Sequence, residues 1–376
     1  LVIRDDGLYG LSGQNDEGHL SKKFDPLTGA VLAELVTARR ACTRPTGSID
    51  SIFYRARGGS TRLDITDERQ DWISPMRAQC HDGVTIANGL LYWWPSVCDC
   101  QLTLYGITCL SSAGDFDFKT HATESQRLEK NVRNLMKVAS LPESSADWPT
   151  FRADNTGSAT TEAVIPEKAR LLWTYNPKIT RASGVSTPTA PVAAGGLIFT
   201  SGPDGIVRAL DASDGRLRWK AYTDGAVRFP PTIWNGRALV GSGDGWVYAF
   251  EAKTGRLLWR FRAAPEERKI PVYGSLLSTW PAASGVLIED GIAYFAAGIV
   301  NYDGTYVYAL DAATGRIKWQ NNTSGHLDEQ AHTGASVQGH QLLHDGRLYL
   351  ASGTSMSPAV YNISNGKCLN DPAILR

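Results

Sequence analysis

The sequence has no excess of charge of either sign and no long apolar run. Lys and Arg total 38, and so do Asp and Glu, which argues against a general nucleic-acid or anionic-membrane binder. No stretch approaches the roughly 18 consecutive apolar residues that a membrane-spanning helix needs, so no span is expected. The first residues lack the basic and apolar regions of a signal peptide and resemble the middle of a strand, so we expect a mature or truncated chain.

Several catalytic signatures are also missing. The chain contains no phosphate-binding Gly-rich loop, no Gly-x-Ser-x-Gly nucleophile elbow and no His-Glu-x-x-His zinc motif. It does contain 37 Gly, 18 Pro and 11 Trp. This composition is typical of a β protein with many tight turns rather than of a helical protein.

One segment recurs three times in the second half of the chain. Residues 204–219, 244–259 and 303–319 share an Asp-Gly start, an alternating run, an Asp/Glu-Ala-x-x-Gly-Arg turn and a final Trp. The alternating run presents one face to a core, and the Gly of the turn takes positive φ. We expect Trp219, Trp259 and Trp319 to cover the seam to the next unit. A second hairpin precedes each unit, so four short strands recur about every 40 residues, which predicts propeller blades.

The rest of the chain fits this scheme less regularly. Units ending near residues 35, 73, 114, 220, 260, 320 and 370 predict an all-β, seven- or eight-bladed β-propeller of four-stranded blades. Residues 1–114 are expected to form degenerate, Cys-rich blades, and residues 147–376 the regular blades of the same propeller. Residues 115–146 are expected to be a linker with a short helical insertion, whose helical stripe is Leu128, Val132, Leu135 and Ala139. The insertion is predicted to cover a blade edge, with docking of a partner protein as the alternative.

The repeated Ala-Leu-Asp-Ala-x-x-Gly-x-x-x-Trp resembles the PQQ-like β-propeller repeat of the quinoprotein alcohol dehydrogenase-like superfamily. The resemblance covers residues 147–370 strongly and residues 1–114 weakly. It implies the propeller fold and, for function, either a quinone-dependent dehydrogenase with PQQ as cofactor or an outer-membrane assembly lipoprotein without a catalytic site. The methanol-type dehydrogenases of this superfamily carry two adjacent cysteines beneath the quinone, whereas the nearest pair here is Cys98 and Cys100.

Cationic residues recur in the loops that join the blades, on the face expected to surround the channel mouth. Converging guanidinium groups favour a small anionic molecule or an acidic glycan, and the alternative is independent, solvated charges. Tyr273 and Trp280, in a long loop of this face, are expected to stack on a sugar or quinone ring, or else to pack within the rim. His81 is the predicted proton acceptor if the site is catalytic. The predicted ligand-binding arginines are Arg44, Arg77, Arg228, Arg262 and Arg268.

Four cysteines are expected on the same face, and they are Cys42, Cys80, Cys98 and Cys100. One hypothesis is two disulfides that staple irregular loops, at about 2–4 kcal/mol each. The other is a thiolate metal site for copper or zinc, with His81 as a further ligand. Cys109 is expected to be a buried apolar residue on an alternating strand. His326 and His332 form a second candidate metal pair, against the alternative of a solvated acidic loop.

These observations favour an extracytoplasmic, quinoprotein-like propeller, periplasmic or extracellular, with a ligand, metal or redox site at the channel mouth. In this hypothesis the chain is a quinoprotein-type oxidoreductase that uses PQQ, copper or zinc. Two alternatives stay open: a non-catalytic scaffold similar to the assembly lipoprotein, and a lyase or hydrolase that acts on acidic glycans. Nucleic-acid binding is not expected, because the loop arginines are the only basic feature.

Overall fold

The computed structural model describes most of the chain as short antiparallel β-strands. The described residues are 1–12, 21–35, 37, 39, 43–56, 59–74, 76, 78, 80–94, 107–110, 123–133, 135–177, 179, 187–272, 275–327, 334–353 and 356–371. They divide into two compact units, Leu1–Phe116 with Pro271–Ser275, and Asp117–Ile270 with Leu276–Arg376, and each unit is described by itself. The described part holds no helix with the length and apolar character that a membrane crossing demands.

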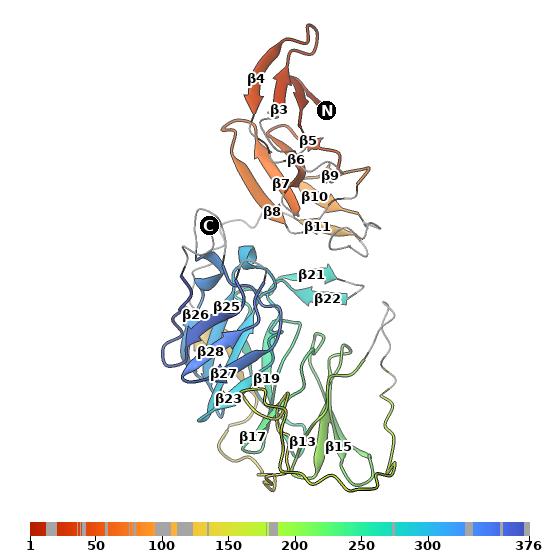
Figure 1. The fold of residues 1–376 in the computed structure, drawn as a ribbon, viewed down its shortest axis with the longest axis vertical. Coiled ribbons are helices and arrows are strands. Elements are labelled where there is room, and N and C mark those ends of the chain that lie inside the picture. Colours follow the sequence, from red (N-terminus) through yellow and green to blue (C-terminus); the bar gives the residue numbers. More distant parts are fainter. Residues whose placement is uncertain are drawn as a thin grey trace. The chain divides into compact units, whose positions relative to one another are not determined.

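The first unit contains three antiparallel sheets whose strands follow chain order (Figure 1). The first two have the four strands predicted for a blade, and the third has three strands within the described residues. The strands are β1 (Val2–Arg4), β2 (Gly7–Gly10), β3 (Ser21–Phe24), β4 (Val31–Leu35), β5 (Thr46–Gly47), β6 (Ser51–Ala56), β7 (Gly59–Asp64), β8 (Gln70–Ser74), β9 (Thr85–Ala87), β10 (Leu90–Trp93) and β11 (Thr108–Leu110).

The second unit contains four sheets, built from the regular repeats. Their strands are β13 (Val192–Ala194), β14 (Leu197–Thr200), β15 (Ile206–Asp211) and β16 (Leu217–Tyr222); β17 (Thr232–Trp234), β18 (Arg237–Gly241), β19 (Trp246–Glu251) and β20 (Leu257–Arg262); β23 (Leu287–Glu289), β24 (Ile292–Ala297), β25 (Tyr306–Asp311) and β26 (Ile317–Asn321); and β27 (Gln341–His344), β28 (Arg347–Leu350) and β29 (Ala359–Asn362). Strands β21 (Lys269–Val272) and β22 (Ser275–Ser278) form a separate hairpin, whose residues 271–275 belong to the first unit. Two 3₁₀ turns, η1 (Asn301–Asp303) and η2 (Ser324–His326), lie in loops of the second unit. The first three of these sheets confirm the predicted antiparallel, four-stranded repeat, and the last has three strands within the described residues.

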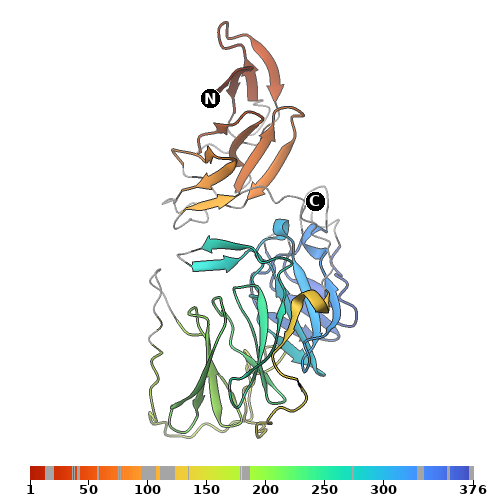
Figure 2. The same cartoon turned by 180° about the vertical axis from the view of Figure 1, so that it is seen from behind.

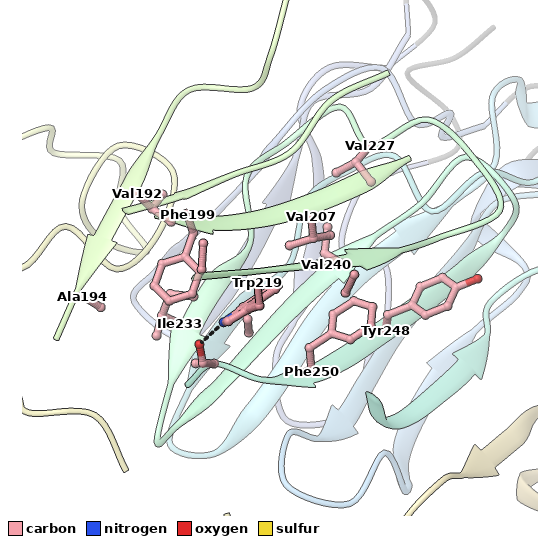
Figure 3. Close-up of a cluster of buried hydrophobic side chains, with 14 of the residues drawn as sticks. Val192, Ala194, Phe199, Val207, Trp219, Val227, Ile233, Val240, Tyr248 and Phe250 are labelled. Atoms are coloured by element: carbon pink, nitrogen blue, oxygen red, sulfur yellow. Dashed lines mark hydrogen bonds between the residues drawn. The ribbon is translucent and has the colours of Figure 1, made fainter. Parts of the chain in front are cut away.

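The tryptophan that closes each repeat lies at the seam between neighbouring sheets, as predicted. Trp219 packs in a buried apolar cluster with Phe199 of β14 and Val207 of β15, and Figure 3 shows these side chains together. Its indole N–H donates a hydrogen bond of 2.9 Å to the carbonyl oxygen of Ala252 in the next repeat. Trp319 makes the equivalent bond to Ile363 at 2.6 Å. These two seams therefore combine apolar burial with a satisfied indole N–H, whereas the indole N–H of Trp259, at the seam between them, is buried without a hydrogen-bond partner among the described residues.

The predicted helical insertion is wrong over most of its length. Among residues 123–133 and 135–146, the part of the insertion that the structure describes, only α1 (Glu124–Arg127) is helical, and the following residues form β12 (Leu128–Lys130), which pairs antiparallel with β20. Figure 2 shows this gold-coloured segment along the sheets of the second unit. Strand β20 would otherwise expose unpaired backbone groups at the sheet edge, and β12 satisfies them, which a helix cannot do. The insertion does cover a blade edge, but it does so as a strand.

The number of blades in a closed ring stays a prediction. Within the described ranges there are seven sheets of three to five strands, in addition to the β21–β22 hairpin.

The predicted insertion at residues 115–146 belongs almost wholly to the second unit, which begins at Asp117. A single propeller built from both units likewise stays a prediction.

Candidate binding site

Each sheet of the second unit has two different ends. At the loop end lie the connections from one sheet to the next, together with the loops between second and third strands. At the turn end lie tight hairpin turns, such as Asn235-Gly236 between β17 and β18 and Asp290-Gly291 between β23 and β24. Asn235 and Asp290 have positive φ values of 42° and 49°, a conformation that Asn and Asp tolerate better than most residues. The loop end of this unit carries Arg228, Arg262 and Arg268, three of the five arginines predicted for ligand binding.

Arg268 and Trp280 contact each other at the loop end. The guanidinium carbon of Arg268 lies 5.5 Å from the Trp280 ring centroid, within the range of a cation–π contact. The same guanidinium pairs with Glu266, with Nη2 and Oε2 3.0 Å apart. Trp280 is fully buried, and its indole N–H donates a hydrogen bond to the carbonyl oxygen of Asp303. In this arrangement the ring predicted to stack on a ligand packs against the protein's own side chains.

Asp303 is a loop-end residue that the sequence analysis did not single out. It ends η1, in the loop between β24 and β25. Burial raises its pKa to about 6, although the positive charge of Arg268 acts in the opposite direction. The signal that could have found it is the repeat itself, because Asp303 begins the third repeat just as Asp204 and Asp244 begin the first two. Those two have structural roles: Asp204 pairs with Arg208, and Asp244 accepts a 2.5 Å hydrogen bond from the hydroxyl of Tyr248.

The remaining predicted residues fall into three groups. Arg44 and His81 are exposed and Cys80 is half-buried, all in the first unit, whereas Arg228 is exposed and Arg262 half-buried in the second. The residues outside the described ranges are Arg77, Tyr273, His332, Cys42, Cys98 and Cys100. Convergence of the cations on one rim, and the disulfide and metal hypotheses for the cysteines, therefore stay predictions. Within the described ranges, no three His, Cys, Asp or Glu residues are placed to hold a metal ion.

A segment that precedes the repeats crosses the first strands of all four sheets. Trp148 forms an antiparallel bridge with Ala193 in β13, and the carbonyl of Pro149 accepts a 2.8 Å hydrogen bond from the amide of Ile233 in β17. Farther along, Asn155 donates from its side chain to the carbonyl of Ile288 in β23, and its own carbonyl accepts from Leu343 in β27, each at 2.8 Å.

Phe151 anchors this segment between the sheets. Its ring lies 5.4 Å from that of Phe229 and 4.8 Å from that of His340, centroid to centroid. Burial lowers the pKa of His340 to about 4, so its ring is neutral near pH 7. The side of the first strands, where a propeller has its channel, is thus occupied by the chain itself.

The turn end holds a second part of the same segment. The buried guanidinium of Arg237 donates a 2.7 Å hydrogen bond to the carbonyl of Leu135, and the carboxylate of Glu251 accepts one of 3.2 Å from the amide of Ala139. Burial alone would raise the pKa of Glu251, but its hydrogen bonds, including those from Thr254 and Ala139, bring it below its ordinary value. We call residues 128–133 and 135–155 the docked segment. It is non-helical, and at these positions the sheets bind it through its backbone groups.

Repeated antiparallel sheets sealed by seam tryptophans define a β-propeller repeat protein. Residues 158–374 match the family model described as outer membrane protein assembly factor BamB, a model of PQQ-type repeats. The match covers more than half of the chain, so the chain belongs to this family of PQQ-like β-propeller repeat proteins. No curated protein matches the chain.

Solved structures with similar folds include dehydrogenases and an assembly factor. The quinohemoprotein alcohol dehydrogenase ADHIIG of Pseudomonas putida HK5 is 19% identical, with 60% of this chain and 40% of that chain covered and a TM-score of 0.48. The corresponding enzyme of Comamonas testosteroni is 19% identical, with 59% and 40% covered and a TM-score of 0.49. BamB of Moraxella catarrhalis is 15% identical, with 47% and 62% covered and a TM-score of 0.27. The chain spans about 40% of the length of the two dehydrogenases.

Proposed function

We propose that the chain is a protein-binding scaffold that holds non-helical polypeptide segments against the ends of its blades. The docked segment carries this proposal, because it contacts all four sheets of the second unit without forming a helix. Arg237 and Glu251 bind its backbone rather than its side chains, so the same sites accept segments of varied sequence. The family description, an outer membrane protein assembly factor, supports a role in binding other proteins and a place outside the cytoplasm.

The loop end supports the scaffold over a quinone-dependent oxidoreductase. A quinone stacked on Trp280 would have to displace Arg268, which lies over that ring and is paired with Glu266. The side of the first strands is crossed by residues 148–155, with Phe151 packed beside Phe229 and His340. The described residues of the loop end therefore do not fit a ring cofactor on Trp280, and we derive no chemical step through one. The acidic-glycan and metal hypotheses depend partly on residues outside the described ranges.

Two measurements on the full chain test this proposal. The first is binding of fluorescently labelled 16-residue peptides by anisotropy, beginning with the sequence of residues 126–141, its scrambled form and a form with every Lys and Arg changed to Glu. We expect at least one peptide to bind with a dissociation constant of about 10–100 µM, typical of a small and transient interface. The second is titration with PQQ and Ca²⁺, followed by absorbance and by reduction of an artificial electron acceptor with short alcohols, for which we expect no turnover.

The outcomes separate the two classes of function. Stoichiometric quinone binding with turnover, and no binding of any peptide, would refute the scaffold and favour the oxidoreductase. Peptide binding without turnover supports the scaffold. A chain that binds no peptide and no quinone would also refute our proposal.

A further inference from the structure

The turn ends of the second unit form three successive seams, and the docked segment occupies two of them. At the first seam, between the β13–β16 and β17–β20 sheets, Leu141 packs against the buried cluster that contains Trp219. At the second, between the β17–β20 and β23–β26 sheets, Leu128 lies against Gly315, and a Cβ atom at that glycine would meet both Leu128 and Trp259. The buried Arg127 side chain also reaches this seam and donates a 3.1 Å hydrogen bond to Tyr308. Both positions are therefore occupied by the chain itself.

The third seam, between the β23–β26 and β27–β29 sheets, is an open groove of about 430 Å³. Its apolar floor includes Ile292, Trp319 and Ile363, and its rim carries the exposed acidic pair Glu289 and Asp290. By strand position, Ile292 at the start of β24 corresponds to Arg237 at the start of β18, which holds the docked segment at the second seam. The third seam thus has the same architecture as the filled ones.

The seam tryptophans are less exposed at the two occupied seams than at the open third seam. Trp219 is 8% exposed and Trp259 is 0% exposed, whereas Trp319 is only half-buried. Trp319 is nevertheless held in place, because its indole N–H donates to the carbonyl of Ile363. Its ring therefore presents a fixed aromatic surface to the groove. At the other two seams, an apolar side chain of the docked segment covers the corresponding surface.

The charge of the groove indicates what binds there. Glu289 and Asp290 make the local potential negative. Burial is the main cause that raises the pKa of Tyr294 to about 12, and the negative charges of these two residues add to the rise. Lys318, which also lines the groove, pairs with Asp311 at 3.7 Å. The part of the chain that fills the other seams, residues 128–142, carries three Lys or Arg residues and one Glu, a net charge of +2. An apolar and basic segment is therefore complementary to the open groove.

We propose that the third seam is the docking site for a basic, apolar, non-helical segment of a partner protein, an inference that rests on the proposed scaffold function and locates its binding site. An apolar side chain of that segment packs on Trp319 and Ile363, and a Lys or Arg pairs with Glu289 and Asp290. The occupant takes the place in this seam that Leu128 and Leu141 have in the other two. The chain therefore offers a partner the same kind of surface that it uses to hold its own segment.

The test uses the full chain and the labelled peptide of residues 126–141 as the probe. The double variant Glu289→Lys with Asp290→Lys is expected to weaken binding about tenfold or more, because it replaces attraction by repulsion. The matched control, Glu162→Lys with Glu167→Lys, changes two exposed acids outside the docked segment by the same total charge and should leave affinity unchanged. A second variant, Ser364→Trp, places bulk at the groove and leaves its charge unaltered, and it should weaken binding to a similar extent. Thermal unfolding of each variant verifies that it is folded.

Each result has a definite meaning. Loss of affinity in both groove variants but not in the control supports the docking site. Equal peptide affinity in all variants would overturn the groove while leaving the scaffold proposal in place, because the peptide would then bind elsewhere. Absence of binding for every peptide of the panel would instead refute the scaffold itself.

Discussion

We expect two glycine-to-alanine substitutions to destabilise the protein by different amounts, although both glycines have positive φ. The difference comes from the packing at the seam between repeats. Gly255 and Gly346 both have positive φ, +75° and +68°. A Cβ atom on Gly255 would lie 2.6 Å from the Trp219 ring, whereas one on Gly346 would meet nothing within 4 Å. Gly346→Ala therefore measures only the cost of left-handed backbone, about 1–2 kcal/mol. Gly255→Ala adds the overpacking of a buried tryptophan, typically about 1–3 kcal/mol more.

The assay is thermal unfolding of the full chain by calorimetry and near-ultraviolet circular dichroism. At roughly 2–4 °C per kcal/mol for a unit of this size, we expect Tm to fall by about 2–8 °C for Gly346→Ala. The fall for Gly255→Ala should be larger by about 2–12 °C, in the transition that belongs to the second unit. The near-ultraviolet signal of the Gly255 variant should also change, because Trp219 must move. Equal shifts of Tm in the two variants would refute the idea that Trp219 seals the seam against Gly255.

Two further predictions concern acid stability. His340 has a folded-state pKa lowered to about 4, so stability should fall as pH drops from about 6.5 to 4, and His340→Phe, which keeps a ring beside Phe151, should flatten this dependence. Asp303 has a pKa raised to about 6, so its contribution has the opposite sign: it is present at low pH and lost as pH rises from about 4 through 6. Asp303→Asn should therefore make the loss of stability on acidification steeper. Urea unfolding midpoints at pH 4, 5, 6 and 7 check both, and parallel pH profiles for wild type and variants would contradict them.

The repeats could be predicted from the sequence because each one carries its own local signals. Alternating apolar residues and a turn glycine specify β15 and β16, and the same pattern recurs in the next two repeats. The packing of Trp219 against the following repeat was also predictable, since a large aromatic residue at the end of every unit needs a surface to cover it. Local signals of this kind do not depend on distant parts of the chain.

The docked segment could not be predicted in the same way, because its structure is decided by distant partners. Leu128 and Leu135 have helical spacing, yet pairing with β20 and the hydrogen bond from Arg237 impose a non-helical chain. Asp303 was missed because its raised pKa comes from burial in the folded loop and not from its sequence neighbours. The placement of Phe151 between Phe229 and His340 is likewise a product of tertiary structure.

The pairing of β12 with β20 has a consequence for biosynthesis. Glu129 forms its ion pair with Arg260, 131 residues later in the chain. At a synthesis rate of about 5–20 residues per second, roughly 7–26 s pass before the ribosome supplies the strand that β12 needs. During that interval Leu128 and Leu135 have no sheet to cover them, so the nascent chain exposes apolar groups to chaperones and to neighbouring chains. The third and fourth sheets follow later still, and a polypeptide stalled near residue 200 would display this segment with almost nothing to hold it.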